Sequence, residues 1–197
     1  MTIKKVILIG LIVIMLEAIG GYIYLTYRKE IPSINIPTSS QLAEVKSIDP
    51  QSKPLLALKT DLDMIKKNGT FTVSAVLEGN GNNASASDLT IRYDPKMVAL
   101  VATNSAKPFT ESPIFQKTVY NSLDAKTGLA TVSAVSETEQ SLPERGFLTT
   151  MIFKALKVGP TEITIVFTPG ETRDTNIVSE SKDILGSVEN LSLNIQP

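Results

Sequence analysis

Two different hydrophobic patterns divide the chain. Residues 6–25 form an almost uninterrupted apolar run. A helix of twenty residues is about 30 Å long, the thickness of the hydrocarbon core of a bilayer, so this run predicts a transmembrane helix. From Leu55 onward, short apolar runs alternate with polar residues at the period of a β-strand. The pattern therefore predicts one N-terminal transmembrane helix followed by an all-β domain.

The strands of this domain are predicted from alternation and from the turns between them. Apolar residues alternate with polar ones at 71–77, 89–93, 129–135, 163–167 and 191–195. Asn68-Gly69 and Gly159-Pro160 are turn pairs. The run 148–155 is apolar on both faces, which predicts a central strand buried on both sides. Residues 96–102 are the best candidate for one short helical turn. About nine strands predict a two-sheet β-sandwich or jelly roll.

These patterns give three segments. Residues 1–27 are predicted to be an uncleaved signal-anchor helix, residues 28–54 a proline- and serine-containing stalk, and residues 55–197 the β-sandwich. A cleaved signal peptide is the alternative for the first segment, but its apolar region would be shorter and would end in small residues. The expected location is the cell membrane, with a single pass and the C-terminal domain outside the cytoplasm.

One carboxylate lies inside the apolar run. Glu17 shares a helix face with Gly10 and Gly21, and small residues beside a polar group favour contact between helices. Self-association through this face is one interpretation, and a protonated Glu tolerated in a tilted helix is the other. Type IV pilins also carry such a Glu, but their leader cleavage site is missing here. A structural, pilus-like subunit therefore stays among the alternatives.

Composition excludes several classes of function. The net charge is −1, so the chain has no electrostatic surplus for nucleic acid. It has no cysteine and no histidine, which removes thiolate chemistry, imidazole metal ligands and the usual general base at neutral pH. We therefore predict that the chain is not an enzyme. Tryptophan, the common platform for sugars, is absent too.

Four motifs in order carry a resemblance to a known family. Residues 88–95 read Asp-Leu-Thr-Ile-Arg-Tyr-Asp-Pro, and residues 67–73 contain Gly-Thr-Phe-Thr-Val. Residues 146–155 end in Phe-Lys-Ala, and a Gly-led turn and strand follow at 159–165. Together these segments resemble the cohesin family, over about residue 55 to the C-terminus. The resemblance implies a non-catalytic module with a flat sheet face that binds dockerins, which are small calcium-loaded helical modules on other proteins.

The resemblance also implies residue roles. Asp88 matches a position that hydrogen-bonds the dockerin in cellulosomal cohesins, and Tyr120 and Glu137 fall near two other contact positions. Ala86 departs from the Asn that these cohesins often have. Any calcium is expected on the partner, so no cofactor and no metal is predicted for this chain. Tyr93, Asp94 and Pro95 are interpreted as fold residues, because a buried ring, a turn-capping carboxylate and a fixed φ suit the end of a strand.

Two other groups of carboxylates have competing interpretations. Asp174 and Asn176, with Glu180 and Asp183 further on, offer oxygen ligands of the kind that calcium prefers, although a polar loop between strands has the same composition. We favour the loop. Glu137 and Glu139 could share a strand face as a glycosidase pair does, but no aromatic subsite accompanies them.

The leading hypothesis is therefore a cohesin-type surface module that receives a dockerin-like protein, with a link to polysaccharide breakdown. A carbohydrate-binding module of the same fold is the main alternative, and its partner would be a polysaccharide. Sugar-binding faces need planar aromatic platforms, and most Phe residues of this chain fit core positions. The lack of Trp thus favours a protein partner.

Overall fold

The computed structural model describes residues 52–101 and 107–197, all of which belong to the unit Ser47–Pro197. The predicted anchor at 1–27, its face of Gly10, Glu17 and Gly21, and residues 28–51 of the predicted stalk lie outside the described residues. Within the described residues, no helix is long and apolar enough to cross a membrane.

The described residues form an all-β sandwich, as the alternation predicted, with more strands than the nine expected. The additional elements are mostly very short. The thirteen strands are β1 (Leu55–Thr60), β2 (Ile65–Lys66), β3 (Thr70–Glu78), β4 (Asn83–Tyr93), β5 (Val98–Val101), β6 (Lys117–Asp124), β7 (Leu129–Ser141), β8 (Gly146–Ala155), β9 (Gly159–Ile165), β10 (Asn176–Ser179), β11 (Lys182–Asp183), β12 (Ser187–Glu189) and β13 (Leu191–Gln196).

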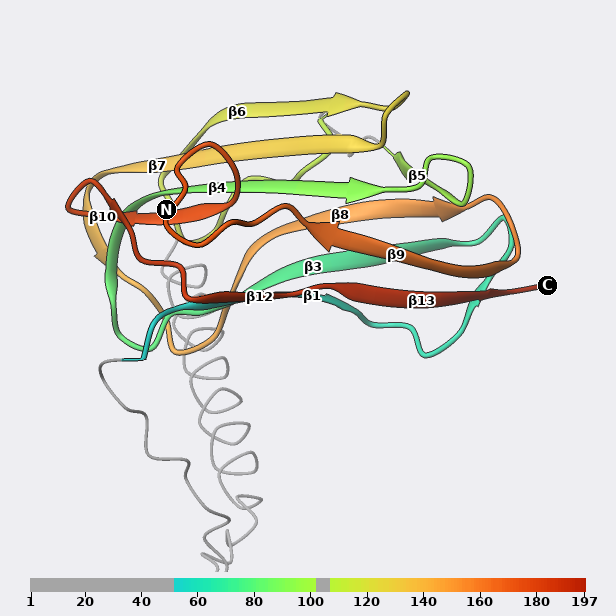
Figure 1. Cartoon of the computed structure of the whole chain (residues 1–197), viewed down its shortest axis with the longest axis horizontal. Helices are drawn as coiled ribbons and strands as arrows, with labels where there is room; N and C mark the ends of the chain where they lie inside the picture. Colours follow the sequence, from blue (N-terminus) through green and yellow to red (C-terminus); the bar gives the residue numbers. More distant parts are fainter. Residues whose placement is uncertain (1–51, 102–106) are drawn as a thin grey trace, which may run out of the picture. The chain divides into compact units, whose positions relative to one another are not determined.

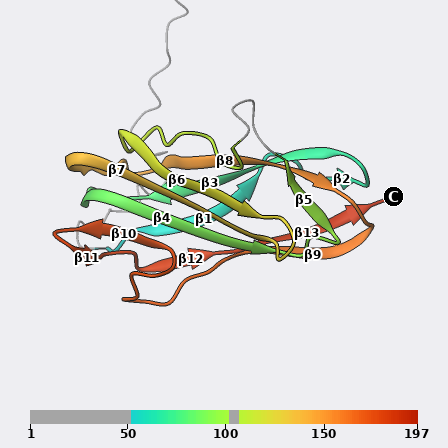
Figure 2. The same ribbon diagram turned by 90° about the horizontal axis from the view of Figure 1, so that it is seen from above.

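The strands form two sheets that pack face to face (Figure 1). One sheet has five strands in the order β12-β1-β3-β8-β5. The other has eight, with β11-β10-β4-β9-β13-β2 in a row and β7 and β6 added beside β4. Most neighbours are antiparallel, whereas β1 with β12 and β13 with β2 are parallel. Figure 2 shows the same layers from above.

Strand β4 is the centre of the larger sheet because both of its edges are paired. Along one edge it pairs with β7 over Asn83 to Arg92. Along the other it pairs first with β10, through residues 86–88, and then with β9, through residues 91–93. From Ala86 to Arg92 each residue of β4 therefore has a neighbour on β7, and Asp88 has one on β10 as well.

The core lies between the two sheets, and three aromatic rings in contact with one another link its two sides. The Phe153 ring is stacked on Phe71, with ring centroids 5.7 Å apart, and meets the edge of Tyr93 at 5.3 Å and 86°. These rings come from β8, β3 and β4, so they join the two sheets. Such aromatic pairs contribute about 0.5–1.5 kcal/mol beyond their burial. Smaller apolar side chains of both sheets fill the rest of the core.

The strand-end turn after β4 has the contacts expected of fold residues. Tyr93 is only 5% exposed, and burial raises the pKa of its phenol. The carboxylate of Asp94 accepts a hydrogen bond from the Lys96 backbone nitrogen at 2.9 Å. The Tyr93 nitrogen donates to the Gly128 carbonyl at 2.9 Å, which holds the β6–β7 turn against this one.

Two expectations were wrong. The helical turn expected at 96–102 is a turn as far as Met97 and then strand β5, because Val98 and Leu100 are buried and pair with β8. Strand β8 was expected to be buried on both sides. It is central in its sheet, but Phe147 and Ile152 on its outer side are exposed, so its second apolar face meets solvent.

Candidate functional site

The alternation of β4 presents a row of small and polar side chains on the outside of the larger sheet. Ser87, Leu89 and Ile91 point into the core and are buried. Asp88 and Thr90, between them, therefore face outward, since successive side chains of a strand point to opposite faces. We refer to the outward side chains of β4, β6 and β7 around Asp88 as the Asp88 face.

Strand register aligns the central residues of this face. Asp88 is paired with Ser133 of β7, and Ser133 is paired in turn with Tyr120 of β6. On the other side, Asp88 is paired with Asn176 of β10. The residues Tyr120, Ser133, Asp88 and Asn176 thus follow one another across four strands, β6, β7, β4 and β10. Two predicted contact residues, separated by about thirty positions in the sequence, share one row.

Asn176 holds the Asp88 carboxylate in place. Its amide nitrogen donates to Asp88 Oδ2 at 3.1 Å and to the Asp174 carbonyl at 3.1 Å. Asn176 itself is buried, whereas Asp88 is half-buried. The bond to Asn176 is the only hydrogen bond to the Asp88 carboxylate from the described residues, so Oδ1 stays available to a donor from outside. A carboxylate acceptor that is held in place by an amide loses little conformational freedom on binding.

A β-bulge brings Tyr120 to the surface. The pairing of β6 with β7 shifts by one position between Thr118 and Tyr120, which leaves Val119 without a partner. Val119 and Tyr120 are 52% and 54% exposed, two large exposed apolar side chains side by side on an edge strand. Bulges redirect side chains in this way at functional edges of sheets. Tyr is also among the residues that most often carry binding energy in interfaces.

Glu137 lies outside the aligned row. The pairing of β7 with β4 is interrupted between Val135 and Gln140, and Glu137 belongs to this interruption. It is exposed, and its backbone nitrogen donates to the Gln116 side chain at 3.2 Å. Its neighbour Glu139 accepts hydrogen bonds from Ser179 Oγ and the Glu180 nitrogen, at 3.0 and 2.8 Å. Glu137 is therefore at the rim of the Asp88 face, and Glu139 is tied to the β10–β11 turn.

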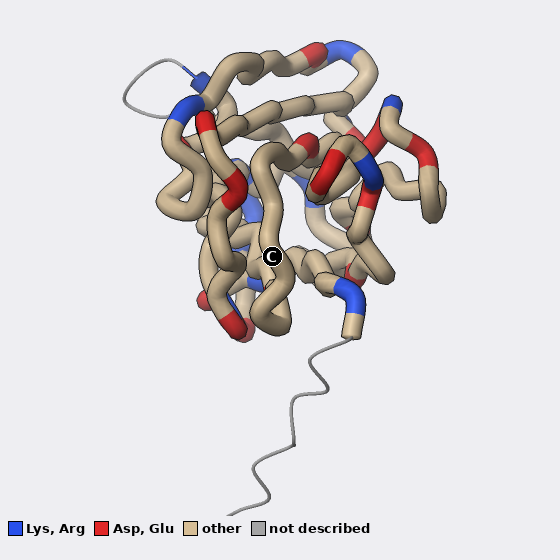
Figure 3. Tube along the Cα trace, turned by 90° about the vertical axis from the view of Figure 1, so that its left-hand side faces the viewer, with Lys and Arg blue, Asp and Glu red and all other residues tan. Residues whose placement is uncertain are grey.

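The positions of the face beside this row are polar. Thr90 and Thr131, two residues along their strands from Asp88 and Ser133, share a hydrogen bond between their hydroxyls at 3.2 Å. Figure 3 shows acidic and basic positions interspersed along the described chain, and in this view neither sign of charge is concentrated on one side. Hydroxyls, one carboxylate and one aromatic ring on the outer face of a sheet suit a protein surface with matching hydrogen-bond donors.

The candidate calcium residues have mostly structural contacts. Asp183 Oδ1 accepts hydrogen bonds from the backbone nitrogens of Ile177 and Leu185, at 3.2 and 2.9 Å. One further oxygen on each of Asp174, Asn176 and Asp183 is buried and accepts no hydrogen bond. No three acidic side chains in the described part of the chain come together as a metal site would require.

Sequence reasoning missed two residues of the row. Ser133 and Asn176 carry no motif, and only the pairing of β7 and β10 with β4 brings them beside Asp88. The available signal was the position of Asn176 in a polar segment, which was weighed as a calcium site or as a plain connecting loop but not as a partner of Asp88. Val119, next to Tyr120, was missed because a bulge has no reliable sequence pattern.

Comparison with known sequences gives no match. No protein-family model matches the chain, and no curated protein does.

Comparison with solved structures gives one consistent fold. A type II cohesin domain from the cellulosome of Acetivibrio cellulolyticus is 17% identical, with a TM-score of 0.55, and the match covers 73% of this chain and 96% of that one. A type III cohesin module from a cell-surface anchoring scaffoldin of Ruminococcus flavefaciens is 13% identical, with a TM-score of 0.57 and coverage of 75% and 90%. The cohesin of a type I cohesin–dockerin complex from Clostridium thermocellum is 13% identical, with a TM-score of 0.51 and coverage of 74% and 100%. The described domain therefore has the cohesin fold.

Proposed function

We propose that this chain is a non-catalytic binding module that receives a dockerin-like protein on the Asp88 face. The observation that carries the proposal is the straight row of Tyr120, Ser133 and Asp88 on the outer face of β6, β7 and β4. Three similar structures come from cohesin–dockerin complexes, a cohesin–X-dockerin pair among them. The cohesin fold and the outward-facing hydrogen-bonding row together support this partner class over others.

The chemistry of the face supports a protein more than a sugar. Tyr120 is the single aromatic ring in the row, and the remaining positions are hydroxyls and a carboxylate. A helical partner would place its own basic or amide side chains opposite Asp88, and its apolar side chains against Val119 and Tyr120. In protein interfaces a few central residues of this kind carry most of the binding energy. A link to polysaccharide breakdown would come through enzymes that carry the partner module.

The experiment is a titration of the full chain with a panel of calcium-loaded dockerin modules, followed by calorimetry. Binding to one or more of them, lost when Asp88 and Tyr120 are both replaced by alanine, supports the proposal. If no dockerin of the panel binds, or if the double variant binds equally well, the Asp88 face is not the docking site.

We also propose that residues 1–27 hold the module at the cell membrane and that residues 28–54 act as a stalk. The support is the length of the apolar run and the prolines that follow it. Protease added to intact cells should then remove the β-domain and leave a short membrane-bound fragment. Protection of the β-domain in intact cells would contradict this arrangement.

A structural, pilus-like role rests on Gly10, Glu17 and Gly21. If that face drives assembly, crosslinking of the full chain gives oligomers that Glu17→Leu abolishes. Crosslinked oligomers that survive this substitution would remove the argument for the face.

A further inference from the structure

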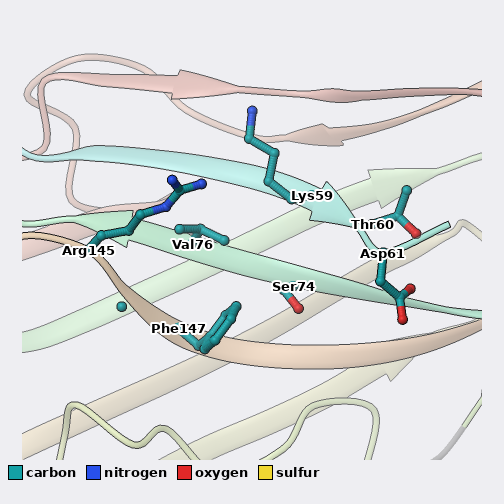
Figure 4. A pocket seen from close by; sticks show the side chains of 8 residues that line it. Lys59, Thr60, Asp61, Ser74, Val76, Arg145 and Phe147 are labelled. Atoms are coloured by element: carbon teal, nitrogen blue, oxygen red, sulfur yellow. The ribbon is translucent and has the colours of Figure 1, made fainter. Parts of the chain in front are cut away.

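The outer side of the five-stranded sheet, away from the Asp88 face, holds a cavity of about 450 Å³. We call it the Phe147 pocket (Figure 4). It is lined by side chains of β1, β3 and β8 and by the segments beside them: Lys59, Thr60, Asp61, Ser74, Val76, Arg145, Gly146 and Phe147. This volume lies within the usual range of small-molecule sites.

A β-bulge creates the apolar part of this pocket. The pairing of β3 with β8 shifts between Ala75 and Val76, so that Leu148 is an extra residue in β8. Leu148 and Thr149 both point inward and are 2% exposed. Phe147 is thereby turned to the outer face, where it is 56% exposed and paired with Val76. Without the extra residue, regular alternation from Met151 would direct Phe147 into the core.

Phe147 and Val76 provide the floor and one wall. Val76 is buried on the outer face of β3, between the Phe147 ring and the Arg145 side chain (Figure 4). The other five Phe residues of the chain are buried or packed against the core. Phe147 is thus the exception among them: a large ring kept in solvent beside a cavity, although it could have contributed to the core.

Polar groups surround this apolar floor. Ser74 and Thr60 supply hydroxyls, Asp61 a carboxylate, and Lys59 and Arg145 cationic donors (Figure 4). Hydrogen-bond donors and acceptors therefore line the pocket together with one exposed aromatic ring.

Each of the two cationic side chains already lies near a carboxylate. Lys59 Nζ lies 2.6 Å from Glu189 Oε2, and Arg145 Nε lies 4.0 Å from Glu78 Oε1. An anionic ligand would have to compete with these carboxylates and with Asp61, so the charge pattern favours a neutral occupant. The loose, exposed Arg145 pair is weak and leaves guanidinium donors for a ligand.

We infer that the Phe147 pocket binds a ring of a neutral polysaccharide. A pyranose ring has an apolar C–H face, which would lie on the Phe147 ring, and an equatorial rim of hydroxyls, which would meet Asp61, Lys59 and Arg145. The mixed lining matches both parts of such a ligand, whereas a purely apolar ligand would leave the polar rim without partners. This site is separate from the Asp88 face and does not depend on the partner proposed for it.

The test uses the full chain in detergent micelles with insoluble cellulose, chitin and xylan, and with the hexasaccharide of each. The wild-type chain should be depleted by at least one of the three solids and should bind the matching hexasaccharide. Phe147→Ala should weaken binding about ten-fold or more, the effect of losing one aromatic contact. Phe147→Tyr keeps the ring and should retain binding.

Ile152→Ala is the matched control, because Ile152 is an exposed apolar residue on the same face of the same sheet but outside the pocket. It should bind sugar like the wild type. The inference is overturned if none of the three glycans binds, or if Phe147→Ala binds as tightly as the wild type. It is also overturned if light scattering shows a dimer that Phe147→Ala dissociates, since the pocket would then be covered by a second copy. Dockerin binding measured on the same variants keeps this outcome apart from that of the proposed function.

Discussion

Asp88 of β4 accepts a hydrogen bond from the side-chain amide of Asn176 on β10, with Asn176 Nδ2 and Asp88 Oδ2 3.1 Å apart. The Asn176 amide also donates to the Thr172 and Asp174 carbonyls, so it anchors a loop as well as a carboxylate. Asp88 is therefore placed by the fold before any partner arrives.

Replacement of Asp88 should affect both partner binding and folding stability, and the two effects can be measured separately. Asp88→Ala should weaken binding of a dockerin module by about ten-fold or more, as expected for a central interface residue. It should lower the free energy of unfolding by about 1 kcal/mol, because Asn176 loses one of its acceptors. Calorimetry and urea unfolding measure the two effects.

Asp88→Asn is the control for this change. It keeps an oxygen toward Asn176 but removes the charge, so stability should stay near that of the wild type while partner binding still falls. A variant that binds the partner as well as the wild type would show that the carboxylate is not a contact.

Tyr120 should be important for binding but not for folding. Its side chain is about half exposed on an edge strand, so Tyr120→Ala should change the free energy of unfolding by less than about 0.5 kcal/mol. The same change should weaken dockerin binding by about 2 kcal/mol, the size of an interface hot spot.

Phe147→Ala, on the outer side of the other sheet, is the control for Tyr120 and should leave dockerin binding unchanged. Equal losses from the two variants would mean that binding is not confined to the Asp88 face.

Two glycines with the same backbone conformation test how closely the β6–β7 turn packs against the end of β4. Gly81 and Gly128 have φ values of 72° and 70°. A Cβ at Gly81 would meet nothing within 4 Å, whereas a Cβ at Gly128 would lie 2.1 Å from the Tyr93 carbonyl oxygen. Gly81→Ala should cost about 1–2 kcal/mol from the left-handed backbone alone. Gly128→Ala should cost at least about 3 kcal/mol, because the β6–β7 turn must move away from β4.

Urea unfolding of both variants measures the difference. Similar losses of stability would show that the contact between Gly128 and the Tyr93 carbonyl is easily relaxed.

Alkaline pH should destabilise the domain through Tyr93. Burial raises the pKa of this phenol above its ordinary value of 10.0, opposed by a backbone hydrogen bond with Leu100 and assisted by the charge of Asp124. The folded state thus prefers the neutral phenol. The resulting stability is complete below about pH 10, the unfolded pKa, and is lost as the pH rises through the higher folded pKa.

Tyr93→Phe should therefore show a smaller loss of stability than the wild type between pH 9 and 11. Denaturation curves across this range test the prediction, and identical pH dependence in the two proteins would refute it.

Calcium should act on the partner. A chelator should abolish binding of a calcium-loaded dockerin, yet leave the thermal unfolding of the isolated chain unchanged. The buried oxygens of Asp174, Asn176 and Asp183 make the second measurement informative, because a calcium-dependent rise in unfolding temperature would assign a metal to this loop.

The strands that sequence reasoning found are those with one clearly apolar face. Strands β3, β4 and β9 each contain a stretch in which buried apolar positions alternate with more exposed ones, so their pattern was sufficient. Strand β6 was missed because it is an edge strand with no fully buried side chain, and its sequence therefore alternates poorly. Its existence depends on pairing with β7.

The candidate site was also predictable only in part. Asp88 and Tyr120 came from family resemblance, but their common row depends on register, which is set by pairing across the sheet and by the bulge at Val119. The position of Phe147 was not predictable, since one extra residue in β8 reverses the face to which it points.

The pairing of β4 along both edges has a consequence for how its outer face meets a ligand. Backbone amides held on both sides by neighbouring strands open only with large parts of the domain, so those beneath Asp88 belong among the last to exchange with deuterium. A partner that docks there meets a preorganised surface. Little entropy is then lost in ordering the module, and differences in affinity between partners should reflect how fast they leave rather than how the module adapts.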